Sequence, residues 1–158
     1  MLPKNDQKVS IKWPNDIFLQ GKKISGILAE TEQEGDKTRL YLGYGLNVNT
    51  DEEVYKTLPN ASSLYIATHK EFSLKELRGH IDMVFIKYLK TFFQEGFHPF
   101  HKAFQELSFL TGKKVALKDG SQELTGHCQG VNEEGCLILK LEDGTEKTIS
   151  SGEIISWE

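Results

Sequence analysis

Three short polar blocks near the start of the chain contain residue types that could bind a small molecule. They read KWPNDI over residues 12–17, KISGIL over residues 23–28 and GYGLNVN over residues 43–49. Between them they supply a cation, a carboxylate, side-chain amides and glycines, and a glycine lets a ligand approach the backbone closely. The pattern predicts one small-molecule site on strands and their turns.

Two interpretations remain open for Lys23, the cation of the second block. A lysine in a strand commonly protects an exposed sheet edge, and from the spacing alone this interpretation is favoured. Alternatively, Lys23 points at an anionic group of a substrate. Gly26 would then let the ligand lie flat on the backbone, and Ile27 and Leu28 would line an apolar pocket.

The polar residues of the first block also allow two interpretations. Asn15 and Asp16 follow Pro14 and could simply form a turn. Asp16 could instead bind Mg²⁺, which prefers carboxylate and phosphate oxygens. Gly43 and Gly45 belong to neither a phosphate-binding loop nor a dinucleotide fingerprint, so alone they are weak evidence for a site.

The composition excludes several classes of function. The chain has 158 residues, of which 38% are hydrophobic and 27% charged, and its net charge is −4. This is typical of a soluble globular protein and argues against broad nucleic-acid binding, and no apolar run is long enough to span a membrane. Residues 1–6 lack the apolar core of a secretory signal, and Cys128 and Cys136 fit no metal-binding spacing. We therefore expect a cytoplasmic protein with reduced thiols and with no nucleic-acid or membrane partner.

A strand meander and a pair of helices must position these blocks. Alternating apolar residues predict an antiparallel meander of strands over residues 9–12, 16–20, 23–30 and 38–47. A short helix could start near residues 61–64. Ser73 and Glu76 form a capping box, behind which apolar residues at helical spacing predict one face of a long helix that ends at Gly96. A further helix begins near Pro99.

After Gly112 the pattern changes to short strands separated by turn signals. The strands are predicted over residues 115–118, 124–131, 136–141, 147–150 and 154–157. Many short strands with such turns indicate a small β-barrel, and because so few residues bury little surface, the barrel should depend on the preceding domain for stability. The sequence thus predicts two domains, residues 1–111 and residues 112–158.

In residues and in spacing, the three blocks resemble motifs of the biotin–protein ligases, also called biotin–[acetyl-CoA-carboxylase] ligases. The C-terminal stretch, with Gly126, Gly130, Gly135 and Gly152, is similar to the SH3-like domain of that family. The resemblance implies an α+β fold. Its first part is a class II synthetase-like domain with a partial mixed or antiparallel sheet and packed helices, and a small SH3-like β-barrel follows.

The resemblance also implies a two-step reaction and assigns residues to it. Biotin reacts with ATP, in the presence of Mg²⁺, to give biotinyl-AMP, and the biotin then passes to a lysine of the biotin carboxyl carrier protein of acetyl-CoA carboxylase. Lys23 aligns with the family's catalytic lysine, which contacts the biotin carboxylate and the α-phosphate. The other implied roles are biotin binding for Gly26, Ile27 and Leu28, nucleotide binding for Asn15, Asp16 and Asn47, and a Mg²⁺ ligand for Asp16.

The chain departs from the family pattern in one respect. In the family, a longer stretch precedes the first block and carries a glycine- and arginine-rich loop that closes over the adenylate, whereas the only arginines here are Arg39 and Arg78. We therefore expect the N-terminal half of the catalytic domain to be missing and the chain alone to biotinylate weakly or not at all. Uncovered strand edges and apolar faces favour association, so a homodimer or pairing with a separate N-terminal half is expected.

Two other functions remain open. One is a lipoate–protein ligase, which shares the fold and a similar pattern of asparagine, aspartate, lysine and glycine. The other is a non-catalytic remnant that serves as a binding or assembly module.

Overall fold

The computed structural model describes residues 8–158, so residues 1–6, in which no secretory signal is expected, lie outside the described part. The chain folds as two compact units. The first contains the described residues up to Ser10 together with Asn15–Ser73, and the second contains Ile11–Pro14 together with Leu74–Glu158. The KWPND block is therefore shared between the units. The predicted division of the sequence at residues 111 and 112 stays a prediction.

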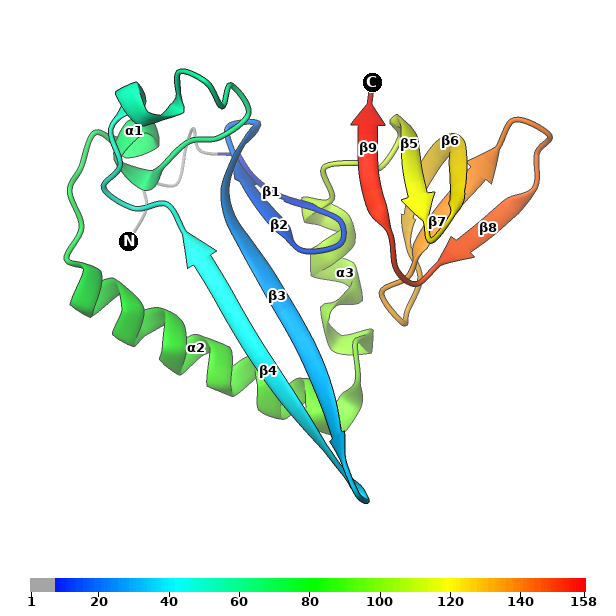
Figure 1. Cartoon of the computed structure of the whole chain (residues 1–158), viewed down its shortest axis with the longest axis horizontal. Helices are drawn as coiled ribbons and strands as arrows, with labels where there is room; N and C mark the ends of the chain where they lie inside the picture. Colours follow the sequence, from blue (N-terminus) through cyan, green and yellow to red (C-terminus); the bar gives the residue numbers. More distant parts are fainter. Residues whose placement is uncertain (1–7) are drawn as a thin grey trace. The chain divides into compact units, whose positions relative to one another are not determined.

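The framework of the first unit is a four-stranded sheet whose strands follow one another in chain order, as Figure 1 shows in blue to cyan. Its strands are β1 (Val9–Lys12), β2 (Asp16–Leu19), β3 (Lys22–Glu34) and β4 (Lys37–Leu46). The antiparallel pairing of β2, β3 and β4 confirms the predicted meander, and β3 is longer than predicted. Gln20 and Gly21 adopt φ values of 52° and 78° between β2 and β3, as a tight two-residue hairpin requires.

Beyond β4 the chain forms a short 3-10 helix, η1 (Glu52–Tyr55), and a short α-helix, α1 (Leu64–Thr68). Ser63 caps α1. Its buried Oγ accepts a hydrogen bond from the backbone nitrogen of Ile66 at 3.1 Å and donates one to the carbonyl oxygen of Thr50 at 2.6 Å. This side chain satisfies one otherwise unpaired helix donor, and the helix start expected near residues 61–64 is confirmed.

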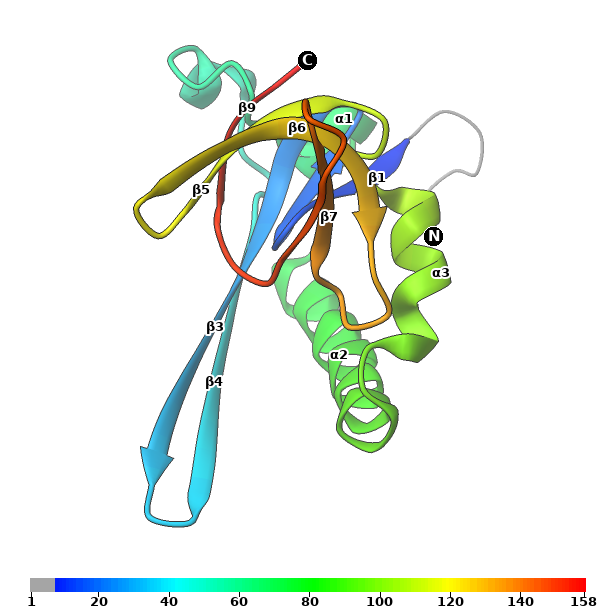
Figure 2. The ribbon, with the colours of Figure 1, turned by 90° about the vertical axis from the view of Figure 1, so that its right-hand side faces the viewer.

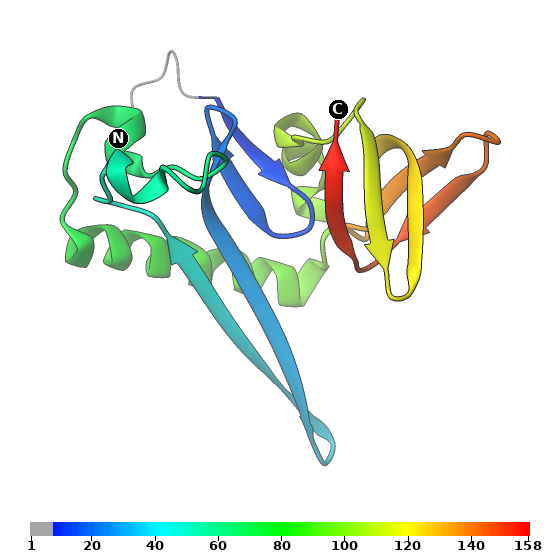
Figure 3. The same ribbon diagram turned by 45° about the horizontal axis from the view of Figure 1, so that its top comes forward.

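The second unit begins, after Ile11–Pro14, with the helices α2 (Leu74–Glu95) and α3 (His98–Leu107), drawn in green in Figure 3. Gly96, with φ of 69°, ends α2, and Pro99 lies in the first turn of α3, as predicted. No residue of α2 is buried. Several of its large apolar residues are more than half exposed: Leu74, Met83, Ile86, Tyr88 and Phe93. Among residues 8–158, no helix is both long and apolar enough to cross a membrane.

A five-stranded antiparallel sheet forms the rest of the second unit (Figure 2). Its strands, all close to their predicted positions, are β5 (Lys114–Asp119), β6 (Gln122–Val131), β7 (Leu137–Leu141), β8 (Glu146–Ile149) and β9 (Glu153–Trp157). The order is β8-β7-β6-β5-β9, so the chain passes from one edge of the sheet to the other between β8 and β9. These two strands do not pair within the described residues, and the expected closed barrel is therefore not confirmed.

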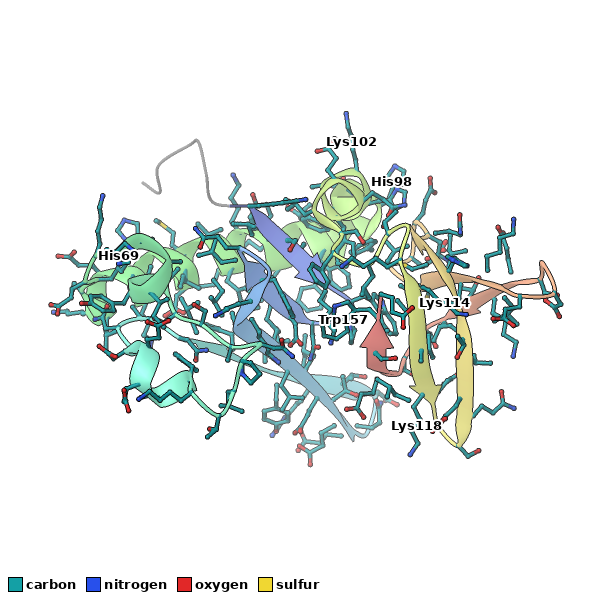
Figure 4. All side chains as sticks on the ribbon, turned by 90° about the horizontal axis from the view of Figure 1, so that it is seen from above. His69, His98, Lys102, Lys114, Lys118 and Trp157 are labelled. Atoms are coloured by element: carbon teal, nitrogen blue, oxygen red, sulfur yellow. The ribbon has the colours of Figure 1, made fainter. Side chains whose placement is uncertain are left out.

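The core of the second unit lies on one face of this sheet and includes Trp13 from the KWPND block. Nε1 of Trp13 donates to the carbonyl oxygen of Gly135 at 3.1 Å. Nζ of Lys12 lies over the ring of Trp157 on β9, 4.9 Å from the ring centroid. Figure 4 labels Trp157. Lys12 and Trp13 thus have structural partners within this unit. The other buried core residues are Leu110, Val115, Leu117, Cys128, Val131, Leu137, Leu139, Ile149 and Ile154.

Candidate functional site

One face of the β2–β3–β4 sheet carries three glycines over a short stretch. Asp16 on β2 lies opposite Gly26 on β3, which lies opposite Gly45 on β4. Two residues further along the same face, Leu28 lies opposite Gly43. Among the described atoms, none lies within 4 Å of the point where a side chain would begin at Gly43 or Gly45. Gly26, Gly43 and Gly45 are here called the glycine floor. They offer bare backbone against which a flat ligand can lie.

Lys23 and Asp16 form an ion pair beside the glycine floor. Nζ of Lys23 lies 2.5 Å from Oδ1 of Asp16, and the side chains are 46% and 14% exposed, respectively. The carboxylate is therefore held within the protein while the ammonium group still reaches solvent. Gly26 provides the space for this pair, because a β-carbon there would lie 3.2 Å from Oδ1 of Asp16 and 3.4 Å from Nζ of Lys23.

A β-bulge brings Lys23 to the face of the glycine floor. Ile17 pairs with Ser25 but Phe18 pairs with Lys23, so Ile24 is an extra residue in β3. Without that residue Lys23 would point to the opposite face, since strand residues alternate, and a bulge re-aims the side chain beside it. Because β3 lies between β2 and β4, the interpretation of Lys23 as an edge-strand lysine is wrong.

The backbone of Lys23 is fixed by the loop that precedes α1. Its nitrogen donates to the carbonyl oxygen of Asn60 at 2.7 Å, and its own carbonyl accepts from the nitrogen of Ser62 at 2.9 Å. Asn47 supports the same loop, because its Nδ2 donates to the carbonyl oxygen of Ser62 at 2.9 Å. The side-chain amide of Asn47 therefore holds in place the loop before α1, to which the backbone of Lys23 is hydrogen-bonded.

The polar turn before β2 is joined to β3 in a similar way. Nδ2 of Asn15 donates to the carbonyl oxygen of Ile27 at 2.7 Å, and the nitrogen of Ile27 donates to the carbonyl oxygen of Asn15 at 3.0 Å. Ile27 lies opposite Tyr44 on the face away from the glycine floor, whereas Leu28 shares the floor's face and is 60% exposed. The floor is thus open to solvent at Leu28, and the ligand roles of these residues stay predictions.

A cavity of about 410 Å³ in the first unit was not found by sequence reasoning. It lies between the start of β3, η1 and the loop before α1. The signal in the sequence that could have indicated this cavity is the acidic run Asp51, Glu52 and Glu53, which lines it together with Lys22. Its lining residues are Lys22, Asp51, Glu52, Glu53, Tyr55, Lys56, Ala61, Ser62 and Ile66.

The described residues do not fit a magnesium ion held by the protein alone. Within residues 8–158, no group of three or more His, Cys, Asp or Glu side chains is placed to share an ion. Asp16 offers a single carboxylate, and its Oδ1 already contacts the ammonium group of Lys23. Mg²⁺ binds proteins through one or two carboxylates together with substrate phosphates, so Asp16 as a Mg²⁺ ligand stays a prediction.

Known proteins match this chain in sequence and in fold. Residues 3–47 match the Biotin/lipoate A/B protein ligase family, and residues 110–157 match the Biotin protein ligase C terminal domain. Over 156 residues, the chain is 33% identical to the bifunctional ligase/repressor BirA of Escherichia coli (strain K12), an alignment that covers 93% of this chain and 46% of that protein. The chain belongs to the biotin protein ligase family.

Solved structures of biotin protein ligases confirm the α+β fold. The ligase of Aquifex aeolicus in complex with biotin and ATP has a TM-score of 0.79 and 32% identity, over 95% of this chain and 62% of that one. The apo structure of the Aquifex aeolicus ligase has a TM-score of 0.80 and 33% identity, over 95% and 65%. The chain spans about half the length of the curated relatives it matches.

Proposed function

We propose that the chain works in biotin–protein ligation, the ATP-dependent attachment of biotin to a protein lysine. The observation that carries the proposal is the ammonium group of Lys23, held on an interior strand beside the glycine floor. A reaction between two anions needs fixed positive charge where negative charge concentrates. Lys23 supplies that charge, and the bare backbone beside it leaves room for a flat ring.

In the first step, an oxygen of the biotin carboxylate attacks the α-phosphorus of ATP. The new P–O bond gives biotinyl-AMP, and the bond to the β-phosphate breaks to release pyrophosphate. Lys23 contacts the carboxylate and the α-phosphate as charge builds up between them. Gly26 and Leu28 receive the biotin from the floor side and Ile27 supports the strand. Asn15, Asp16 and Asn47 lie at the nucleotide end.

In the second step, the ε-amine of an acceptor lysine attacks the acyl carbon of biotinyl-AMP. An amide bond forms, AMP leaves and the amine proton passes to solvent. The acceptor is the biotin carboxyl carrier protein of acetyl-CoA carboxylase, and the reaction takes place in the cytoplasm. Mg²⁺ enters with ATP as part of the substrate. A second copy of the chain associates with the first.

The test is to measure biotinyl-AMP after incubating the chain with ATP and biotin in a single turnover. We expect slow formation, because the site is open to water at Leu28. Lys23→Ala should reduce the rate by about 100-fold or more, as loss of a transition-state charge contact does. Lys37→Ala, at the exposed tip of the β3–β4 hairpin, is the matched control and should leave the rate unchanged.

Three results would contradict the proposal in different ways. Equal rates of biotinyl-AMP formation for the unaltered chain and for Lys23→Ala would show that Lys23 takes no part in the reaction. Lipoyl-AMP formed in preference to biotinyl-AMP would make the chain a lipoate–protein ligase. No adenylate, together with no increase in melting temperature on adding ATP and biotin, would favour a non-catalytic binding or assembly module.

A further inference from the structure

We propose that Asp16 is a positioning residue, whose carboxylate holds the ammonium group of Lys23 above Gly26 in readiness for the reacting anions. The inference rests on the proposed function, because it assigns a role toward Lys23 rather than a separate activity. It differs from the metal-ligand and nucleotide-binding roles expected for Asp16. This positioning role is supported by the contacts that Asp16 makes, by the shape of β3 and by the freedom of a lysine side chain.

A lysine side chain without a partner would not stay at one point of the site. Its flexible stem has many rotamers, and Lys23 is nearly half exposed. Asp16 is mostly shielded from solvent and lies on β2 directly opposite Gly26, so its own position is set by the strand pairing. The 2.5 Å ion pair transfers that fixed position to the ammonium group.

The local backbone is shaped to allow this pair. The extra residue Ile24 turns Lys23 to the face of Asp16. Gly26 lacks a β-carbon, which would lie 3.2 Å from Oδ1 of Asp16 and crowd this carboxylate. Two separate features of β3 thus serve one contact.

The first measurement is a ¹H–¹⁵N NMR spectrum of the lysine ammonium groups in the isotope-labelled chain. We expect a distinct Lys23 signal that moves to the position of unpaired lysines in Asp16→Asn, a variant that keeps the shape and removes the charge. Glu53→Gln is the positive control, because it breaks the 2.6 Å pair with Lys56 and should move only the Lys56 signal. An unchanged Lys23 signal in Asp16→Asn would overturn the inference.

A pair of glycine variants tests the geometry without altering any charge. Gly26→Ala would place a β-carbon against both partners, whereas Gly45→Ala, directly across the strands, meets no described atom within 4 Å. We expect Gly26→Ala to move the Lys23 signal and Gly45→Ala to leave it in place. Equal effects would overturn the inference, and this comparison decides even if Asp16→Asn fails to fold.

The second measurement separates positioning from general damage. In Asp16→Asn we expect the single-turnover rate of biotinyl-AMP formation to fall by about 10-fold or more, since a misplacement of about 1 Å in a reactive site can cost about 100-fold. The dissociation constant for biotin should change by less than about 3-fold, within ordinary context effects on a retained cation. An unchanged rate, or a rate and an affinity that fall together with the melting temperature, would overturn the inference.

Failure of the proposed function would look different. If the unaltered chain formed no biotinyl-AMP and bound no biotin, the proposed function would fall, and the reaction role of Asp16 with it, although the Lys23 signal would still report the ion pair. If the unaltered chain formed biotinyl-AMP and Asp16→Asn formed it at the same rate, only the inference about Asp16 would fall.

Discussion

At the scale of single residues, the adjacent lysines Lys22 and Lys23 have different surroundings. Lys22 lines the cavity beside η1, and Lys23 pairs with Asp16 at the glycine floor. The sequence singles out Lys23, but it does not show which face of the sheet either lysine occupies. Adjacent strand residues point to opposite faces, and the β-bulge at Ile24 places Lys23, rather than Lys22, on the face of the glycine floor. The roles of single side chains therefore depend on contacts that lie outside their own segment.

Cys128 offers a test of burial at this scale. Burial raises the pKa of its thiol above the usual value of 9.0, more than the hydrogen bond with the backbone of Gly130 lowers it. When the pH rises above the pKa of this thiol in the unfolded chain, the unfolded chain loses the thiol proton before the folded chain does. The stability that is present below that pH is therefore lost as the pH rises through the pKa of the thiol in the folded chain. We expect the free energy of unfolding to fall above about pH 9.

Urea unfolding between neutral pH and pH 10 checks this expectation against Cys128→Ala. The variant loses packing and is less stable throughout, but its free energy of unfolding should decline less steeply with pH because the buried thiol is gone. Parallel pH curves for the two proteins would show that the burial of Cys128 does not contribute to the alkaline loss of stability.

At the scale of elements, the sequence predicts strand and helix positions well because those signals are local. Alternating residues and turn glycines such as Gly21 and Gly144 mark the strands, and Gly96 and Pro99 mark the helix ends. The bulge at Ile24 and the open edges of the second sheet depend on which distant strands pair, which no local pattern contains. Likewise, helical periodicity shows which α2 side chains share a face but not what covers them.

The bulge in β6 supports a prediction about the second sheet. The pairing register shifts between Cys128 and Gly130, and Gly130 has φ of 112°. A β-carbon there would collide with the side-chain amide of Gln105, whose Oε1 accepts a hydrogen bond from the nitrogen of Val131 at 3.2 Å. Gly130→Ala should therefore cost about 2–4 kcal/mol, through backbone strain together with the loss of this bond.

Gly144→Ala is the matched control for Gly130→Ala. Gly144 also has a positive φ, 86°, but a β-carbon there meets no described atom within 4 Å. We expect a cost of about 1–2 kcal/mol from backbone strain alone. Urea unfolding of both variants measures the difference, and an equal loss of stability would mean that the approach of Gln105 to β6 contributes nothing.

At the scale of the whole molecule, the exposed apolar surface of α2 indicates that the chain binds a partner. Met83, Ile86 and Phe93 recur along α2 at helical spacing and are 63%, 55% and 68% exposed. Val84, Tyr88 and Phe92, at another helical spacing, are also 48%, 53% and 44% exposed, so α2 carries exposed apolar side chains on more than one side. Large apolar side chains exposed together on one element are typical of interaction surfaces.

We therefore expect the chain to self-associate through α2. Burying apolar area on a second copy contributes about 25 cal/mol per Å², and truncating three large side chains removes much of that gain. Light scattering after size exclusion should show a mass that rises with concentration in the unaltered chain and falls to the monomer when Met83, Ile86 and Phe93 are all replaced by serine. Glu95→Ser changes an exposed residue on the opposite side of the same helix and should leave the association unchanged. A monomer mass for the unaltered chain at every concentration would exclude this homodimer, whereas equal loss of association in Glu95→Ser would place the contact on another part of the helix.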